Sequence, residues 1–258
     1  MRSTTRFVAL GLAGMLLAAC AHKDKDAPLA FVPADTPYVV ANLDIMDDST
    51  RTALLAQADA QLPSQLTQLD AAADRLAAKD PDGARLLRAL HTEFNGKTIE
   101  TFAQSTGIDL KGYFAYYGEG LSPVMRLPLS NPQAFEGFVS RLETAYGKKL
   151  DQASVDKQSY RKYVFAASGT EVILATVDKQ LVAALLPADA SPTLLRQTLG
   201  LERPQKSLQD DGRLTALAKA KGYKWMVGDL DLTRALPLAF GGQDPLTATT
   251  IDPNYLGL

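Results

Sequence analysis

The spacing of hydrophobic residues predicts a helical segment near the start of the folded part. Over residues 46–106, leucines and alanines recur every three or four positions, which is the spacing of one helical face. Asp47, Asp48 and Ser49 are candidate N-caps. Pro63 and Asp80-Pro81 interrupt the pattern, so we expect three helices separated at these prolines. A short fourth helix over about 98–105 would end at Gly107.

Residues with strand patterns lie on both sides of this helical segment. The stretch YVVANLDI (38–45) reads as a well-buried strand, because β-branched and aromatic residues fill it. Residues 113–129 resemble a hairpin that turns at 118–120. Residues 159–187 contain three apolar runs and predict an antiparallel meander. Residues 223–232 predict a last strand.

Further helix signals lie between the predicted strands. Asn131-Pro132 and Ser191-Pro192 each place a capping residue before a proline, which favours a helix start. A third, short helix should end at Gly222. We therefore expect an α+β fold, in which an N-terminal helical segment is followed by a mainly antiparallel sheet packed with helices. Residues 31–258 would form a single α+β domain.

Two of the predicted strands resemble each other. YVVANLDI near the start and KWMVGDLDL near the end both read as an apolar strand, an acidic residue and a helix start. The similarity is short enough to be either a coincidence or a duplication. In the second case the chain would be the first part of a longer repeat protein. The closing stretch GGQDPLTATTIDPNYLGL shows neither helical nor strand spacing, which fits a fragment or a loosely packed tail.

The first twenty residues predict an export signal. Arg2 and Arg6 precede an uncharged, mostly apolar run over 7–19, which is too short to span a bilayer. The residues Leu17-Ala18-Ala19-Cys20 resemble the lipobox of bacterial lipoproteins. In that family the cysteine receives a diacylglyceryl group, the leader is cut before it, and the freed amine is acylated. The resemblance implies a signal peptide over 1–19 and lipid attachment at Cys20.

The resemblance also implies where the protein resides. Residues 20–30 would be a lipidated, solvated tether. Ala21 stands where an aspartate would favour the inner membrane of Gram-negative cells, so we expect the outer membrane, facing the periplasm. The alternative is an ordinary secreted protein with a chance cysteine. However, Cys20 is the only cysteine in the sequence and has no partner for a disulfide.

The overall charge is acidic and argues against a nucleic-acid partner. Removing residues 1–19 takes away two arginines and leaves 25 basic and 29 acidic side chains, a net charge of −4. Basic residues form isolated pairs rather than a stripe. The expected partners are therefore the membrane, reached through the N-terminal lipid, and an envelope protein.

A second resemblance involves the start of the folded part. The phrase FVPADTPYVVANL (31–43), followed by a mixed α/β body, resembles uncharacterised exported bacterial proteins whose mature part also begins with Pro-Ala-Asp-Thr before a strand. That family carries no established activity. The resemblance therefore implies a fold more than a function.

Few residues point to catalysis, and we predict no cofactor, metal or catalytic residue. His22 lies in the predicted tether and His91 on a predicted helix, without the spacing of a metal site or a serine hydrolase motif. Gly241-Gly242 lacks the lysine of a phosphate loop. Asp210-Asp211-Gly212 and the 80–83 stretch lack the alternating ligands of a calcium loop.

Two other groups of residues have both a functional and a structural interpretation. Asp229 and Asp231 could act together on one strand face, although we favour Asp231 as the cap of a helix at Thr233. Tyr113, Tyr116 and Tyr117 cluster on the predicted hairpin. Burial is the default for such aromatics, and a ligand-facing sheet is the alternative.

We therefore predict a lipid-anchored, non-enzymatic binding or assembly component of the bacterial envelope. The alternatives are a carrier of a lipidic ligand and an envelope hydrolase. A carrier requires a large apolar pocket, and an interaction protein an exposed apolar patch. An enzyme requires a cleft with convergent polar groups around an acid or base of perturbed pKa.

Overall fold

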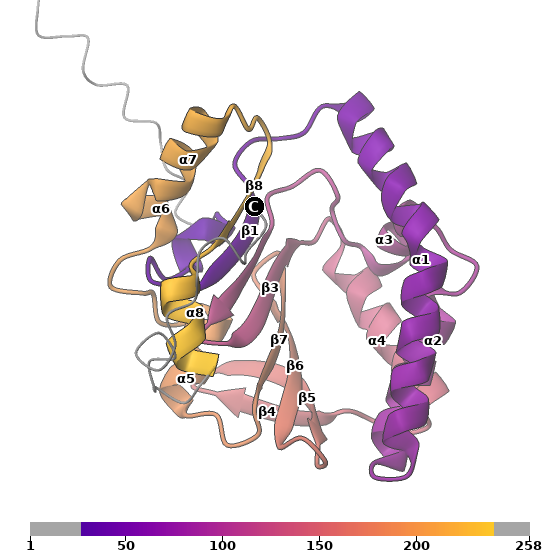
Figure 1. Cartoon of the computed structure of the whole chain (residues 1–258). Helices are drawn as coiled ribbons and strands as arrows, with labels where there is room; N and C mark the ends of the chain where they lie inside the picture. The colour runs from indigo at the N-terminus through magenta and orange to yellow at the C-terminus, as the bar shows by residue number, and fades with distance from the viewer. Residues whose placement is uncertain (1–26, 240–258) are drawn as a thin grey trace, which may run out of the picture.

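One antiparallel sheet of eight strands organises the protein (Figure 1). The computed structural model describes residues 27–239. The strand order is β4-β5-β6-β7-β3-β2-β1-β8, and every neighbouring pair is antiparallel. The strands are β1 (Tyr38–Asn42), β2 (Ala115–Glu119), β3 (Ser122–Pro128), β4 (Asp151–Val155), β5 (Gln158–Phe165), β6 (Thr170–Val177), β7 (Gln180–Pro187) and β8 (Met226–Leu230).

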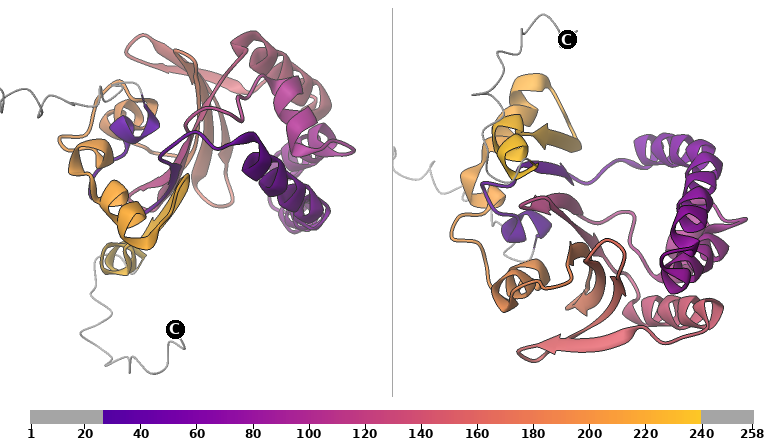
Figure 2. Two further views of the ribbon diagram at one scale, coloured as in Figure 1. Left: turned by 90° about the horizontal axis from the view of Figure 1, so that it is seen from above. Right: turned by 60° about the horizontal axis from the view of Figure 1, so that its bottom comes forward.

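Helices lie on both sides of this sheet (Figures 1 and 2). The first group is α1 (Asp48–Ala77), α2 (Pro81–Phe94), α3 (Ile99–Thr106) and α4 (Pro132–Tyr146). The second group comprises the 3₁₀ helix η1 (Pro28–Phe31), α5 (Pro192–Leu199), α6 (Leu208–Asp211), α7 (Arg213–Lys221) and α8 (Leu232–Ala239). The chain thus confirms the predicted α+β class, with helices preceding most of the antiparallel sheet.

Each face of the sheet has its own hydrophobic core. Phe102, Phe135 and Phe138 of α3 and α4 pack with Leu181 of β7 in one core. The core on the other face contains side chains of β1, β2, β3, β6 and β7 together with Leu199, Leu208 and Leu214 of α5, α6 and α7. Alternating side chains along each strand supply the two cores, as expected for a sheet between two helical layers.

The first helix differs from the prediction. The sequence predicted two helices separated at Pro63, but α1 runs unbroken over thirty residues with Pro63 inside it. Leu62 and Ala73 are its buried residues, and it packs along α2 rather than on the sheet. A proline removes one backbone donor and crowds one carbonyl. Packing along α2 offsets that local cost.

Two elements escaped the sequence analysis. The polar strand β4 lies at one end of the sheet, and the four-residue α6 lies in the stretch 201–212 that we expected to be a loop. The hairpin turn also lies slightly later than expected, between Glu119 and Ser122. Residues 28–30, placed at the end of the predicted tether, lie in η1, where Pro28 and Ala30 are buried. Polar composition hides β4 and α6, since their order comes from neighbours distant in sequence.

Apart from the break at Pro63, the predicted helix ends are confirmed. Asp47 caps α1 by accepting a hydrogen bond from the Thr50 amide, and Asn131 caps α4 by accepting from two amides. Gly107 ends α3 with a φ of 72°. A side chain there would lie 2.1 Å from the carbonyl oxygen of Asn131, so both the backbone conformation and the close approach require glycine.

The hairpin tyrosines are divided between the two faces of the sheet. Tyr117 is fully buried, as burial by default predicted, but Tyr116 and Tyr113 are about two-fifths exposed. Tyr116 lies beside Val40 of β1, which is 36% exposed. One face of β1 is therefore partly open, whereas the sequence predicted a well-buried strand. The helices α2, α3 and α4 cover the other half of this face and leave the β2-β1-β8 half open (Figure 2).

Candidate functional site

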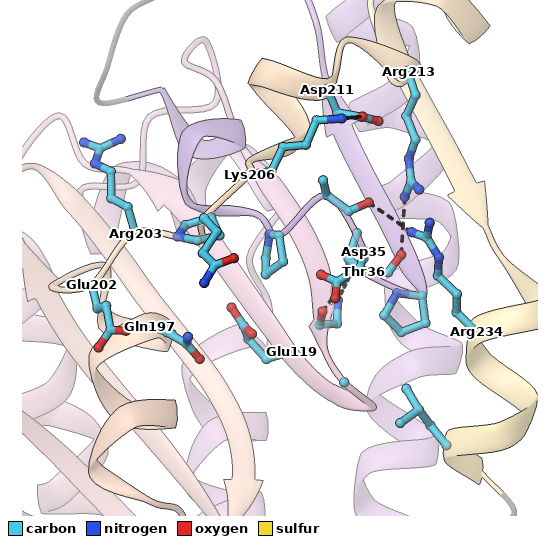
Figure 3. A pocket seen from close by; sticks show the side chains of 18 residues that line it. Asp35, Thr36, Glu119, Gln197, Glu202, Arg203, Lys206, Asp211, Arg213 and Arg234 are labelled. Atoms are coloured by element: carbon cyan, nitrogen blue, oxygen red, sulfur yellow. Dashed lines mark hydrogen bonds and ion pairs between the residues drawn. The ribbon is translucent and has the colours of Figure 1, made fainter. Parts of the chain in front are cut away.

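A pocket of about 840 Å³ lies where five segments of the chain meet (Figure 3). Its lining comes from residues 33–37, the hairpin turn at 118–120, the stretch 197–206, the α6–α7 junction, and α8. The segment 33–37 contains the Pro-Ala-Asp-Thr motif. We call this cavity the 33–37 pocket.

The motif holds the pocket together through its backbone and one hydroxyl. Thr36 is 2% exposed, and its Oγ1 donates to the carbonyls of Gly118, at 2.8 Å, and Tyr38, at 2.9 Å. The same oxygen accepts from the Gly118 amide. The Ala34 amide donates to the Lys206 carbonyl. The motif therefore fixes the hairpin turn and the 197–206 stretch against the start of β1.

Gly118 allows the turn to approach this segment closely. A Cβ at this position would lie 2.4 Å from the carbonyl oxygen of Gly120 and 2.8 Å from the ring of Tyr38. No side chain fits there without a shift of the turn. The turn carries Glu119 into the pocket, where Figure 3 shows its side chain between Gln197 and the pair Asp35 and Thr36.

Glu119 is the most perturbed acid in the described part of the chain. Its pKa is raised to about 7, chiefly by burial; the positive charge of Arg126 opposes this rise, and the nearby Asp35 adds to it. Its Oε1 is buried and has no hydrogen-bond partner among residues 27–239. A buried oxygen without a partner is costly, so it marks a place where a ligand group would be stabilising.

A buried arginine lies behind the pocket. Arg126 is 1% exposed and donates to the Thr198 carbonyl at 2.7 Å and to the Tyr117 hydroxyl at 3.3 Å. Its guanidinium also lies 4.2 Å from the centre of the Phe31 ring. Arg126 is therefore committed to the fold, and it does not neutralise Glu119 through a direct contact.

The other basic side chains of the lining already have partners. Arg213 lies 3.4 Å from Asp229 and donates to the Thr36 carbonyl. Arg234 contacts Asp231 at 3.1 Å and donates to the Ala34 carbonyl.

Two further cations of the lining also have contacts, whereas three of its carboxyl groups make no ion pair within the described residues. Lys206 contacts Asp211, and Arg203 lies 4.4 Å from the centre of the Phe31 ring. By contrast, Asp35, Glu119 and Glu202 make no ion pair with any residue of 27–239. The pocket is thus electrostatically suited to a positively charged group.

Most residues singled out in the sequence lie elsewhere, although Asp211 lines the pocket, and they have structural roles. His91 Nδ1 lies 2.7 Å from Asp70, which connects α2 to α1. Asp80 caps α2, and Asp211 pairs with Lys206. Asp231 caps the start of α8 through the amide of Thr233, as predicted, while Asp229 pairs with Arg213. Residues Cys20, His22 and Gly241-Gly242 lie outside the described residues.

Sequence reasoning missed Glu119 and Arg126. Glu119 stood in a predicted turn, where an acidic residue normally faces solvent, and Arg126 stood within a strand. The available signal was weak: alternation places Arg126 on the same face as the apolar Val124. A charged residue at an inward position is a sign of a buried polar network.

Comparison with known proteins gives no further indication. No protein-family model, curated protein or solved structure matches this chain. Within residues 27–239, no helix is both long and apolar enough to cross a membrane, and no group of three or more metal-ligating side chains converges.

Proposed function

We propose that the protein is a lipid-anchored binding component of the bacterial envelope, and that its 33–37 pocket takes a ligand carrying an ammonium group. The lipid on Cys20 would hold it at the periplasmic face of the outer membrane. The body binds its ligand without chemical change. The membrane, through the lipid, and an envelope partner or ligand are its interaction partners.

One observation carries the binding proposal: the partnerless buried Oε1 of Glu119 in a pocket whose cations are already engaged. An ammonium group beside this oxygen would satisfy it and favour the ionised carboxylate. Asp35 and Glu202 lie on the same lining and add attraction at longer range. The pocket exceeds the roughly 300 Å³ that a small ligand needs.

Two features favour this reading over the lipid-carrier and hydrolase alternatives. Charged and polar side chains of Arg213, Arg234, Lys206 and Glu119 line the pocket, whereas a lipid chain would need apolar walls. The Thr36 hydroxyl is committed to three backbone groups and is not placed as a nucleophile.

Calorimetric titration of the purified full chain tests the binding proposal. The probe is cadaverine, with uncharged 1,5-pentanediol as the matched control compound. Because the pKa of Glu119 is about 7, its ionised fraction rises about tenfold between pH 6 and pH 8. Affinity for cadaverine should rise by a similar factor, while pentanediol should not bind.

Variants assign the effect to the pocket. Glu119→Gln should remove both the affinity and its pH dependence, whereas Glu202→Gln, an exposed carboxyl on the same lining, should change affinity less than about threefold. Equal binding of cadaverine by the wild type and Glu119→Gln, or equal binding of the two compounds, contradicts the proposal.

The anchor has its own test. Cys20→Ser should move the protein from the membrane fraction to the soluble fraction, because serine has no thiol to take the acyl chains that would hold the protein at the bilayer. Intact-mass analysis of the wild type should give a polypeptide that starts at Cys20 and carries acyl groups. A Cys20→Ser protein that stays with the membranes contradicts the lipid attachment.

A further inference from the structure

We propose that the outer edge of β8 pairs with the β8 of a second copy of this chain, antiparallel and centred on Gly228. The pairing would join two eight-stranded sheets into one. This inference does not depend on the 33–37 pocket or on its ligand.

Within the described residues, no strand pairs with the outer edge of β8. This strand ends the sheet, and β1 is its one partner strand within residues 27–239 (Figure 1). The Leu43 amide donates to the Trp225 carbonyl, and the Asp231 amide donates to the Pro37 carbonyl. Backbone groups alternate in direction along an antiparallel strand. Those of Met226, Gly228 and Leu230 therefore point away from β1, with Gly228 at the centre of the free edge.

The two edges of the sheet differ in their protection against such pairing. The edge strand β4 has the sequence DQASV, and lysines 148 and 149 precede it. Charged and polar residues of this kind discourage edge-to-edge association. The edge strand β8 has the more apolar sequence MVGDL, with Asp229 as its charged residue and Lys224 shortly before it. Its Met226 and Leu230 are 45% and 61% exposed.

The sequence of β8 is complementary to itself. Pairing centred on Gly228 places Met226 opposite the partner's Leu230, and Leu230 opposite the partner's Met226. On the other face Val227 lies opposite the partner's Asp229. This register places no two like charges directly opposite each other, and such a pair would be destabilising. Each Asp229 keeps its contact with Arg213 of its own chain, 3.4 Å away.

The chain already contains a pairing of this kind. The two strands whose sequences resemble each other, β1 and β8, lie side by side and antiparallel, with Val40 opposite Gly228. Each is followed by a helix whose first turn is capped by an aspartate, Asp47 in α1 and Asp231 in α8. Because the register centred on Gly228 brings Met226 and Leu230 of the two strands together, we select a second copy of this chain as the occupant of the free edge.

The oligomeric state of the purified full chain tests this inference. Light scattering after size exclusion should give a dimer at micromolar concentration. Leu230→Lys adds a charge at the free edge and should raise the dissociation constant at least tenfold. Leu201→Lys is the matched control, because Leu201 is also exposed, at 40%, but lies after α5, outside the edge. It should leave the dimer intact.

Disulfide cross-linking tests the register, in a chain that also carries Cys20→Ser so that no other thiol is present. The double variant M226C/L230C should form a covalent dimer on mild oxidation, because the two positions face each other across the two-fold axis. M226C alone should not, because the two copies of residue 226 are four residues apart along the strands. A monomeric wild type at about 100 μM, or equal cross-linking by M226C alone, would overturn the inference.

Discussion

Replacing Glu119 by glutamine should stabilise the protein increasingly as the pH rises from about 4.5 to about 7, and by a nearly constant amount above that. The folded chain keeps the Glu119 proton up to a pKa of about 7, whereas the unfolded chain releases it near the ordinary value of 4.5. The folded state therefore binds more protons between these values. Stability falls as the pH rises through this window and levels off above it.

The magnitude follows from the two pKa values. The difference between 4.5 and about 7 corresponds to up to about 3 kcal/mol at about 1.4 kcal/mol per tenfold change in proton affinity. Glutamine has the shape of the neutral acid and avoids this cost. For a chain of this size about 1 kcal/mol shifts the melting temperature by roughly 2–4 °C. Glu119→Gln should therefore melt roughly 6–12 °C above the wild type at pH 8.

Thermal unfolding of the purified full chain at pH 5 and pH 8 is the assay. At pH 5, half a unit above the unfolded pKa of 4.5, the cost is only about 0.8 kcal/mol, so the two proteins should melt within roughly 3 °C of each other. Glu202→Gln serves as the control and should follow the wild type at both pH values, because Glu202 is exposed. If Glu119→Gln gains no more stability at pH 8 than at pH 5, burial does not raise the pKa of Glu119 and the reasoning fails.

Three further substitutions test the frame of the pocket by urea unfolding. Arg126→Met should cost about 2–4 kcal/mol, because the Thr198 carbonyl and the Tyr117 hydroxyl lose a buried donor; a cost below about 1 kcal/mol would show that these contacts contribute little. Thr36→Val should cost about 1–3 kcal/mol through the loss of its bonds to Gly118 and Tyr38, with Thr36→Ser expected to retain most of the stability. Gly118→Ala should cost at least about 1 kcal/mol, because its methyl group would meet the turn backbone; unchanged stability would mean that the turn shifts freely.

Local signals in the sequence located most elements of the fold. Helix starts at Asp47, Asn131 and Ser191 were correct, because each supplies a side-chain oxygen to amides two or three residues away. Glycine at position 107 ended its helix for an equally local reason. Elements without such a signal were missed or misjudged: β4 is polar, and α1 continues through Pro63 because α2 packs along it.

What the sequence alone determined is therefore the α+β class, the capped helix ends and the apolar strands, since each depends on residues within a few positions of one another. The lipid anchor at Cys20 is likewise a sequence inference, and it stays a prediction. Tertiary structure alone decided the pocket. It brings Thr36 within hydrogen-bond distance of Gly118, 82 residues away, and Arg234 to Ala34, 200 residues away. It also buries Glu119, and burial is the physical reason why an ordinary turn residue acquires an unusual pKa.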